Sequence, residues 1–446
     1  MDIIIVFIIS FILLIASILK GIFIGIPLFL CFLFFVILAL RRNFTPMDIL
    51  QMAYRGNKKV FLVLNIFVLI GAITASWMAS GTMGGIIYYG IQLMRPKYFL
   101  LYSFLISVII SFLLGTAFGT VSTVGVALIV MAKGGGVNIN LAAGAIIAGA
   151  YFGDRASPMS SSANLVATIT DTNLYKNINN MFKTAIIPFI ISLIIYSLLS
   201  LQEPLNLLNN NMGNDILKAF VIDWRVLLPA AMIVVLALLR LDIKLSMLLN
   251  IGLAGFLAVI LQGYSLREII NFIVFGFQLK SPGPLQDILQ GGGILSMANA
   301  AIVVFISSAL SELLIGTDML NNLTIYLNKI RRRSSLFLTT ILTAIATAAF
   351  GCNQTMSIVL TKQLLRESYQ MNQLDNYQLA MDIENSSVVL APLIPWNIAL
   401  FVPATTLAVS PAKITPFLFY LYLIPLCNLI YFKPKNPLSN KTLSQT

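Results

Sequence analysis

The sequence contains no histidine among its 446 residues. Catalytic Ser-His-Asp triads, His-Glu-x-x-His zinc sites and histidine proton relays are therefore excluded. Only three cysteines are present, and the wide spacing of Cys31, Cys352 and Cys427 argues against a CxxC site or a disulfide framework. The chain also lacks a G-x-x-x-x-G-K-[ST] loop, so it carries no Walker-type ATP motor. Any proton carrier must be a carboxylate, tyrosine, lysine or cysteine.

Charged residues are scarce as well. They make up 10% of the chain, whereas hydrophobic residues make up 59% and the mean hydropathy is +0.93. An ordinary soluble domain is about one-quarter charged, so soluble enzyme folds are nearly excluded. The net charge of +12 does not indicate nucleic-acid binding, because the basic residues lie between apolar runs, as in cytoplasmic membrane loops. The composition predicts an all-α polytopic membrane protein that is not an enzyme.

About twelve apolar segments have the composition of spanning or re-entrant helices. They cover residues 3–19, 22–40, 60–93, 98–114, 141–152, 186–201, 224–239, 245–261, 294–314, 336–349, 386–409 and 416–432. Glycine, serine and proline interrupt the pattern at 60–93, 115–136, 153–164, 351–355 and 391–403. Non-helical backbone at membrane depth must be satisfied by protein or by a water-filled cavity. We therefore expect broken helices and re-entrant hairpins, in about 10–12 membrane segments.

An internal repeat indicates how these segments are organised. Residues 117–123 (AFGTVST) align with residues 349–355 (AFGCNQT) at an offset of 232, and Asp154, Pro158 and Asn164 meet Glu384, Pro392 and Asn397 at nearly the same offset. We expect a first membrane repeat at 1–201, a polar linker at 202–223, a second repeat at 224–432 and a cytoplasmic tail at 433–446. The basic segments 41–59 and 329–333 should be cytoplasmic, which makes the two repeats inverted and both termini cytoplasmic.

Polar residues concentrate at the matched breaks and supply the candidate site. Carboxylate, hydroxyl, amide and carbonyl oxygens are the ligands that hard cations prefer, and matched broken helices are typical of secondary transporters. The candidate ion- or substrate-binding residues are Asp154, Ser157, Ser160, Asn164, Thr123, Asn353, Gln354, Thr355, Glu384, Asn385 and Asn397. Sodium is expected at the hairpin tips, at Asn164 and Asn397. Asp154, Glu384 and Glu312 are the candidates for proton coupling.

Several of these features also have purely structural interpretations. Residues 153–164 would serve as a solvated loop with a helix cap, and Trp396 would serve as an interfacial anchor. Asp154 and Arg155 are adjacent and therefore do not share a helix face, so each needs a partner elsewhere. A desolvated aspartate exchanges a proton for sodium more readily, whereas a nearby cation opposes this. The sequence does not decide between these two influences.

At these stretches the chain resembles the NhaC-type sodium/proton antiporter family, within a superfamily of ion transporters. The resemblance rests on GAITASWMASGTMGGIIYYG at 71–90, GTAFGTVSTVG at 115–125, GAYFGDRASPMSSSANL at 149–165 and ENSSVVLAPLIPWN at 384–397. It covers roughly residues 22–432. It implies inverted repeats, re-entrant hairpins and exchange of external protons for internal sodium. Where the family pattern reads SPLSDTTN, this chain has SPMSSSAN at 157–164, so Ser161 replaces a carboxylate.

The function expected from these observations is Na⁺/H⁺ antiport across the cytoplasmic membrane, with no cofactor beyond the transported ions. The alternative is a Na⁺- or H⁺-coupled carrier of a small organic acid or amino acid, which the missing carboxylate at Ser161 favours, with Arg155 or hairpin amides meeting the solute. An intramembrane aspartyl protease and a passive channel are weaker rivals. The expected partners are the lipid bilayer, Na⁺, H⁺ and, under the alternative, the carboxylate or amino acid. A homodimer is a further hypothesis.

Overall fold

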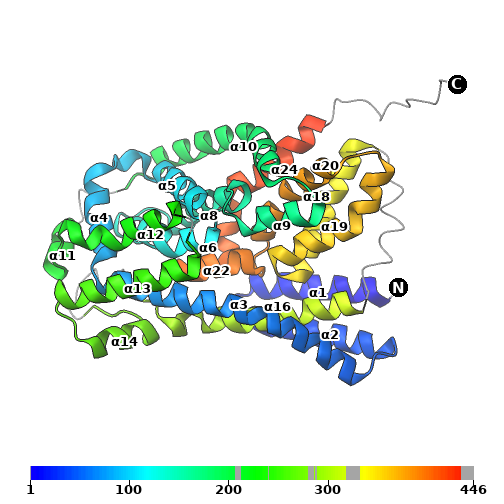
Figure 1. Ribbon diagram of the computed structural model, residues 1–446, viewed down its shortest axis with the longest axis horizontal. Helices are drawn as coiled ribbons and strands as arrows, with labels where there is room; N and C mark the ends of the chain where they lie inside the picture. Colours follow the sequence, from blue (N-terminus) through cyan, green and yellow to red (C-terminus); the bar gives the residue numbers. More distant parts are fainter. Residues whose placement is uncertain are drawn as a thin grey trace.

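The computed structural model describes residues 2–205, 212–239, 241–279, 286, 289–317 and 332–432. In this part of the chain the regular elements are helices, and an isolated bridge pairs Phe277 with Gly291. The first half (Figure 1) comprises α1 (Asp2–Leu19), α2 (Gly25–Arg41), α3 (Pro46–Ala79), α4 (Thr82–Leu93), η1 (Pro96–Tyr98), α5 (Phe99–Leu114), α6 (Ala117–Thr120), η2 (Val121–Gly125), α7 (Val126–Gly134), α8 (Ile139–Ala156), α9 (Ser161–Thr170) and α10 (Leu174–Gln202).

The second half has the same all-helical character. Its elements are α11 (Met212–Ala219), η3 (Trp224–Leu227), α12 (Leu228–Leu238), α13 (Ile243–Ile260), α14 (Leu266–Phe275), η4 (Ile294–Met297), α16 (Ala298–Gly316), α18 (Arg333–Gly351), α19 (Gln354–Met371), α20 (Asn376–Glu384), α21 (Ser387–Leu390), η6 (Ala391–Leu393), α22 (Ile398–Thr406), α23 (Pro411–Ile414), η7 (Thr415–Phe417) and α24 (Phe419–Phe432). The expected all-α polytopic class is confirmed.

The described helices include five that are long and apolar enough to cross a membrane, or up to nine if each of four bent helix pairs counts as one span. The pairs are bent by 49° to 96°, and three shorter apolar helices accompany them. The chain is therefore a multi-pass membrane protein. The span Ala117–Gly134 was not among the expected segments, because the glycine, serine and threonine residues of 115–136 were interpreted as a break between helices. Ala117–Gly134 is instead one helical span with a π-helical turn, 83% buried inside the protein.

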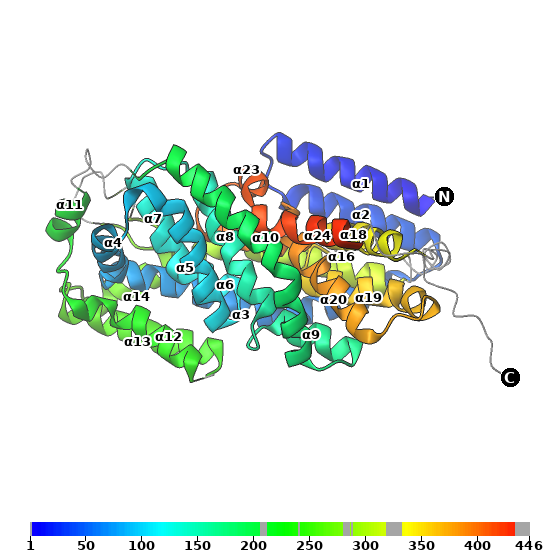
Figure 2. The same cartoon turned by 90° about the horizontal axis from the view of Figure 1, so that it is seen from above.

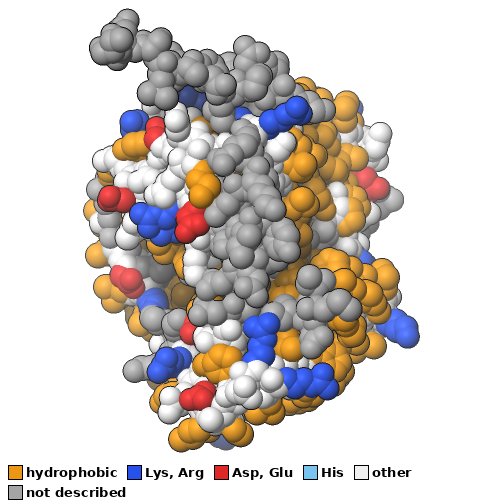
Figure 3. Space-filling view, turned by 90° about the vertical axis from the view of Figure 1, so that its right-hand side faces the viewer, with side chains coloured by type: hydrophobic (Ala, Val, Ile, Leu, Met, Phe, Trp, Pro, Cys, Tyr) orange, Lys and Arg blue, Asp and Glu red, His pale blue; other side chains and the backbone are white. Residues whose placement is uncertain are grey.

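The helices α1, α2, α3 and α16 lie roughly along the long axis of the molecule (Figures 1 and 2). α9, α18, α19 and α20 lie at the end where α1 begins, whereas α4, α11 and α14 lie at the opposite end. Figure 3 looks onto the first of these ends, where Lys, Arg, Asp and Glu side chains gather beside a hydrophobic flank. Some predictions concern residues outside the described ranges. These are the predictions for Lys329 and Arg331, for the tail 433–446 and for residues 206–211 of the linker.

Matched helix breaks occur in the two halves. α5 is followed by the cap residue Gly115 (φ 67°) and α18 by the cap residue Cys352 (φ 49°), both in the left-handed region. The next helices start with the side-chain caps Thr116 and Asn353, which are 237 positions apart. The caps of α9 and α22, Ser160 and Asn397, are separated by the same interval. These caps are therefore 237 positions apart, whereas the AFG motifs align at an offset of 232, and the internal repeat stays a prediction.

The last turn of α8, which leads into the break between α8 and α9, packs closely against α5. A Cβ atom added to Gly153 would lie 2.0 Å from the backbone carbon and oxygen of Ser111. The Ser111 hydroxyl donates to the Gly149 carbonyl (3.0 Å) and accepts from the Gly153 amide (2.9 Å). The hydroxyl thus bridges one turn of α8 just before Asp154. Only glycine allows this approach of two backbones, which fixes the last turn of α8.

Candidate functional site

Asp154 lies near the C-terminal end of α8 and is 7% exposed. Its Oδ2 atom accepts hydrogen bonds from the Ser162 hydroxyl (2.9 Å) and from the Gln354 amide (3.0 Å), and Oδ1 accepts from the Ala117 backbone amide (3.5 Å). No described Lys or Arg nitrogen forms an ion pair with it. Asp154 is therefore a buried carboxylate held by neutral donors.

Two interrupted helices begin at this carboxylate. Ala117 is the first residue of α6, and Gln354 is the first residue of α19. Helix N-termini carry partial positive charge and free backbone amides, which stabilise a nearby anion. The two breaks, one from each half of the chain, thus converge on Asp154 and stabilise its negative charge without a cationic side chain.

Further oxygen atoms gather beside Asp154. The Ser160 hydroxyl donates to the Asp154 backbone carbonyl, and the Ser162 hydroxyl reaches the same carbonyl (3.1 Å) and lies 3.3 Å from Ser160. Ser160 also caps α9 by accepting from the Ala163 amide (3.1 Å). Ser162 was not among the expected site residues. The hydroxyl run 160–162 was the available signal, but α9 had to be placed before Ser162 could be distinguished from Ser161.

Arg155 is fully buried on the other face of α8. Its guanidinium donates to the Glu384 carbonyl (3.3 Å), the Met181 carbonyl (3.4 Å), the Thr184 hydroxyl (3.0 Å) and the Asn385 side-chain oxygen (2.5 Å). These acceptors lie on α10 and at the end of α20. As expected, Asp154 and Arg155 have separate partners. Arg155 connects the first half of the chain to the break in the second half.

Glu384 is the last residue of α20 and is fully buried. Among the described residues, neither of its carboxyl oxygens has a hydrogen-bond partner, and the side-chain amide nitrogen of Asn385 also lacks one. Most buried polar groups are paired, so an unpaired carboxyl group calls for a functional explanation. An ionised carboxylate without hydrogen-bond donors is costly to bury. A cation does lie beside this residue, because the Arg155 guanidinium donates to the Glu384 backbone carbonyl (3.3 Å).

A second buried carboxylate lies two residues earlier and is fully paired. Asp382 accepts from Arg333 at 2.6 Å and 2.8 Å and from the Tyr369 hydroxyl at 2.5 Å. Tyr369 in turn lies 2.9 Å from the Thr340 hydroxyl. This bidentate ion pair joins the start of α18 to α20. Sequence reasoning did not select it, because Arg333 had been assigned only to a basic cytoplasmic cluster.

The remaining expected site residues stabilise their own helix breaks. Ser157 donates to the Phe112 carbonyl (2.7 Å), and Thr123 donates to the Gly119 carbonyl (2.7 Å). Asn353 caps α19 by accepting from the Thr355 amide (2.8 Å), and the Thr355 side chain is exposed. None of these four side chains makes a hydrogen bond to Asp154 or Glu384 among the interactions of the described residues.

The two hairpin-tip asparagines likewise bond locally. Asn164 is exposed and donates to the carbonyls of Ser160 (2.7 Å) and Pro158 (3.2 Å). Asn397 is fully buried, donates to the Ala348 carbonyl (2.8 Å) and caps α22 by accepting from the Ala399 amide (2.9 Å). A sodium ion at these tips stays a prediction.

The turn before α22 closes the end of α18. The Trp396 indole donates to the Ala349 carbonyl (2.6 Å), and the Ile398 amide donates to the Cys352 carbonyl (2.9 Å). Together with Asn397 these groups satisfy carbonyls that a helix end leaves unpaired. Trp396 is only 3% exposed, so it is a buried cap and not an interfacial anchor.

Two other residues lie away from the Asp154 oxygens. Glu312 lies on α16 against α3, where its Cγ would be 3.0 Å from a Cβ atom at Gly56. Ser161, which replaces a family carboxylate, is exposed in the first turn of α9 and makes no bond to Asp154. The missing carboxylate therefore leaves the described Asp154 cluster intact. No group of three or more Cys, Asp or Glu side chains among the described residues is placed to hold a metal ion.

The chain is similar in sequence to known antiporters. The sequence model of the Na⁺/H⁺ antiporter family matches residues 149–432. The chain is 28% identical over 413 residues to the Na⁺/H⁺ antiporter NhaC of Bacillus subtilis, which covers 91% of each chain. It is 27% identical over 405 residues to the malate-2H⁺/Na⁺-lactate antiporter of the same organism, covering 89% of this chain and 86% of the relative.

A third relative is the arginine/ornithine antiporter ArcD of Halobacterium salinarum, which is 27% identical over 385 residues, covering 84% of this chain and 78% of the relative. The family match spans more than half of the chain and includes Asp154, Arg155, Glu384 and Asn397. The chain therefore belongs to the Na⁺/H⁺ antiporter family.

Proposed function

We propose that this protein exchanges Na⁺ for H⁺ across the cytoplasmic membrane, and that the two ions compete for Asp154. The observation that carries the proposal is the convergence of two interrupted helices, one from each half, on a buried carboxylate without a cationic partner. The family membership and the NhaC relatives support the same function.

The chemistry of Asp154 suits this competition. Its carboxylate, its own carbonyl and the hydroxyls of Ser160 and Ser162 form a cluster of hard oxygen ligands, the type that binds Na⁺-like cations. A proton on Asp154 removes the negative charge that attracts sodium. Binding of either ion therefore excludes the other. Each ion shifts the inward/outward equilibrium only by its differential affinity for the two states.

Glu384 provides a second position for a proton. It follows the paired Asp382 by two residues, and its carboxyl oxygens accept no hydrogen bond from the described residues. Arg155 binds the Glu384 carbonyl, so movement of the α20 end and movement of α8 are mechanically connected. In this proposal Glu384 releases its proton only when the surrounding helices rearrange and admit water or a cation.

The test is transport by purified protein in liposomes that contain a luminal pH indicator. A sodium gradient alone should drive a pH change in wild-type liposomes, and the Asp154→Asn variant should be folded but silent. A matched variant, Ser161→Ala, changes an exposed neighbour on α9 and should transport normally. An unchanged sodium-driven flux in Asp154→Asn would remove this residue from the mechanism.

The same liposomes test the alternative function. Two relatives are an antiporter of malate and lactate and an antiporter of arginine and ornithine. A coupled solute carrier would give no pH change with sodium alone, but would show uptake of radiolabelled malate, lactate, arginine or ornithine. We infer a cytoplasmic-membrane location with both termini inside, which accessibility labelling of single cysteines at the ends of the chain would test.

A further inference from the structure

The short helix that carries Glu384 is tied to its surroundings at two places. α20 has nine residues and ends at Glu384. The Asp382 carboxylate pairs with Arg333 at the start of α18 (2.6 Å and 2.8 Å). The Arg155 guanidinium of α8 donates to the Glu384 carbonyl (3.3 Å). The first contact holds α20 within the second half of the chain and the second connects it to the first half, so the place of Glu384 depends on both.

The Arg333–Asp382 pair is a rigid contact. The Asp382 side chain is fully buried, and the Arg333 side chain is 15% exposed. Two parallel hydrogen bonds between a guanidinium and a carboxylate fix the orientation of both groups as well as their distance. The Tyr369 hydroxyl of α19 donates to the same carboxylate (2.5 Å). Asp382 is thus held from two neighbouring helices, and α20 cannot turn about its axis without breaking these bonds.

The backbone of Asp382 is held as well. Its carbonyl accepts from the hydroxyl of Ser386 (2.5 Å), which lies in the break between α20 and α21. Glu384 and Asn385 lie between these two residues, and the Asn385 side-chain oxygen accepts from Arg155 (2.5 Å). Asp382 therefore links α18 and α19 on one side to the segment that Arg155 contacts on the other.

The Arg333–Asp382 pair acts on Glu384 through the position of the helix. Residues two positions apart on an α-helix are separated by about 200° around its axis, so Asp382 and Glu384 point to different sides of α20. The Arg155 bond to the Glu384 carbonyl is the contact most easily lost. At 3.3 Å it is already longer than the usual range of about 2.7–3.2 Å, so a small displacement of the end of α20 breaks it.

We propose that Arg333 is a positioning residue for ion exchange. Through Asp382 it holds the end of α20 in the place where Glu384 and Arg155 meet. This role rests on the proposed Na⁺/H⁺ exchange, in which Glu384 carries a proton. The Asp154 carboxylate takes its hydrogen bonds from α6, α9 and α19. Loss of the Arg333–Asp382 pair should therefore slow exchange but leave sodium binding at Asp154 nearly unchanged.

A double variant separates this role from a contribution to stability. Arg333→Met combined with Asp382→Asn removes both charges, a change that is often neutral for stability, and the asparagine oxygen still accepts from Tyr369. The double variant should recover most of the stability that Asp382→Asn alone loses. Its maximal sodium-driven rate in liposomes should nevertheless fall about three- to thirtyfold, the size of effect that connected networks transmit, while its sodium affinity in calorimetry stays within about twofold of wild type.

Arg333→Lys tests the geometry if the double variant does not fold. Lysine keeps the charge but cannot form two parallel hydrogen bonds, so the maximal rate should again fall while the sodium affinity is kept. Arg332→Lys changes the exposed neighbouring arginine in the same way and should transport at the wild-type rate.

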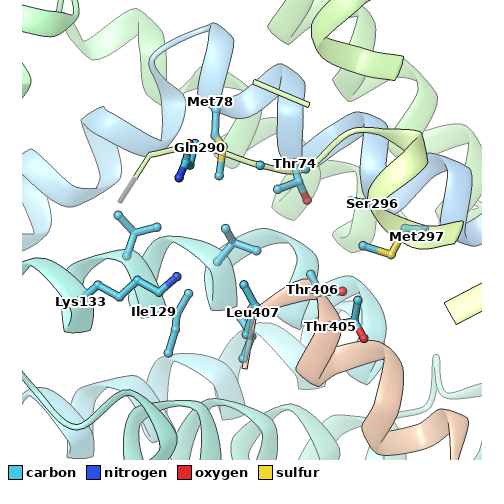
Figure 4. Close-up of a pocket in the computed structure, with 15 residues that line it drawn as sticks. Thr74, Met78, Ile129, Lys133, Gln290, Ser296, Met297, Thr405, Thr406 and Leu407 are labelled. Carbon is cyan, nitrogen blue, oxygen red and sulfur yellow. The ribbon is translucent and has the colours of Figure 1, made fainter. Parts of the chain in front are cut away.

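Backbone hydrogen exchange over residues 382–390 measures the placement of the helix end without transport. Exchange should be faster in the double variant than in the wild type. Lys133→Met is the control for removal of a cation elsewhere. The half-buried Lys133 side chain extends into a cavity of about 160 Å³, whose lining residues lie on α3, α7, α22 and the segment 290–297 (Figure 4). This variant should leave exchange over 382–390 unchanged.

The proposal is overturned by a wild-type rate in the folded double variant, by a sodium affinity that falls as much as the rate, or by unchanged exchange over 382–390. If wild-type protein shows no sodium-driven pH change, the proposed function fails, and the exchange comparison alone then decides whether the Arg333–Asp382 pair positions α20.

Discussion

Substitution of two neighbouring carboxylates on α20 should change the stability of the protein by different amounts. Asp382 is paired with Arg333 and Tyr369, whereas Glu384 is equally buried but has no hydrogen-bond partner. Breaking a buried ion pair by removing one charge costs about 3–5 kcal/mol. The Arg333 side chain keeps 15% exposure, so we expect the loss in Asp382→Asn at the lower end of this range.

Substitution of Glu384 should cost much less. Glu384→Met removes two unpartnered oxygens and roughly preserves side-chain length, so the free energy of unfolding should change by less than about 1.5 kcal/mol. Glu384→Gln instead introduces an amide N–H₂ group without an acceptor, a penalty of about 1–3 kcal/mol. The expected order of thermal stability is wild type and Glu384→Met, then Glu384→Gln, then Asp382→Asn.

Thermal unfolding of the four proteins in one detergent measures this order. A transport assay then separates a role in stability from a role in transport. Glu384→Met should remain stable but lose the sodium-driven pH change. A Glu384→Met variant as unstable as Asp382→Asn would refute the reasoning, since it would mean that the Glu384 carboxyl group has a stabilising partner in the folded protein.

Three further substitutions test the packing and the ligands. Gly153→Ala should destabilise the protein by at least about 1–3 kcal/mol because its Cβ overlaps the Ser111 backbone, whereas Gly252→Ala, which meets no atom within 4 Å, should not lower the unfolding temperature. Ser162→Ala removes a hydroxyl from Asp154 and should weaken sodium binding about two- to tenfold in calorimetry; unchanged affinity would exclude Ser162 as a ligand. Arg155→Lys should lower the unfolding temperature despite the retained charge, because ammonium cannot reproduce the guanidinium bonds to α10 and α20; full stability would contradict this bridging role.

Much of the fold follows from the apolar runs, because each lipid-facing helix must be apolar along its length. The prediction failed at Ala117–Gly134, where glycine, serine and threonine were read as a break. Its mean hydropathy of 1.6 equals that of Arg333–Gly351, which was predicted, so its glycines and hydroxyl residues, and not a lack of hydrophobicity, led to the wrong interpretation. The internal repeat read from the AFG motifs stays a prediction, whereas the caps Thr116 and Asn353 of the two helix breaks could be located only in the structure.

The candidate site was partly predictable for a related reason. Asp154 and Glu384 could be selected because each lies in a polar stretch that interrupts apolar segments. The identity of their neighbours depends on how helices from distant parts of the chain cross. Gln354 lies 200 positions from Asp154 and Ser162 is eight away, yet both contact the same oxygen. The separation of these residues in the sequence does not predict that they contact the same atom.

The most direct test of the central account is proton release on sodium binding. Purified protein in weakly buffered detergent solution, with a pH indicator present, is mixed with sodium chloride and, as a control, choline chloride. Competition at Asp154 predicts that sodium releases protons from wild-type protein, that choline releases none, and that Asp154→Asn releases none with either salt. Sodium binding without proton release, or release that persists in Asp154→Asn, would contradict the account.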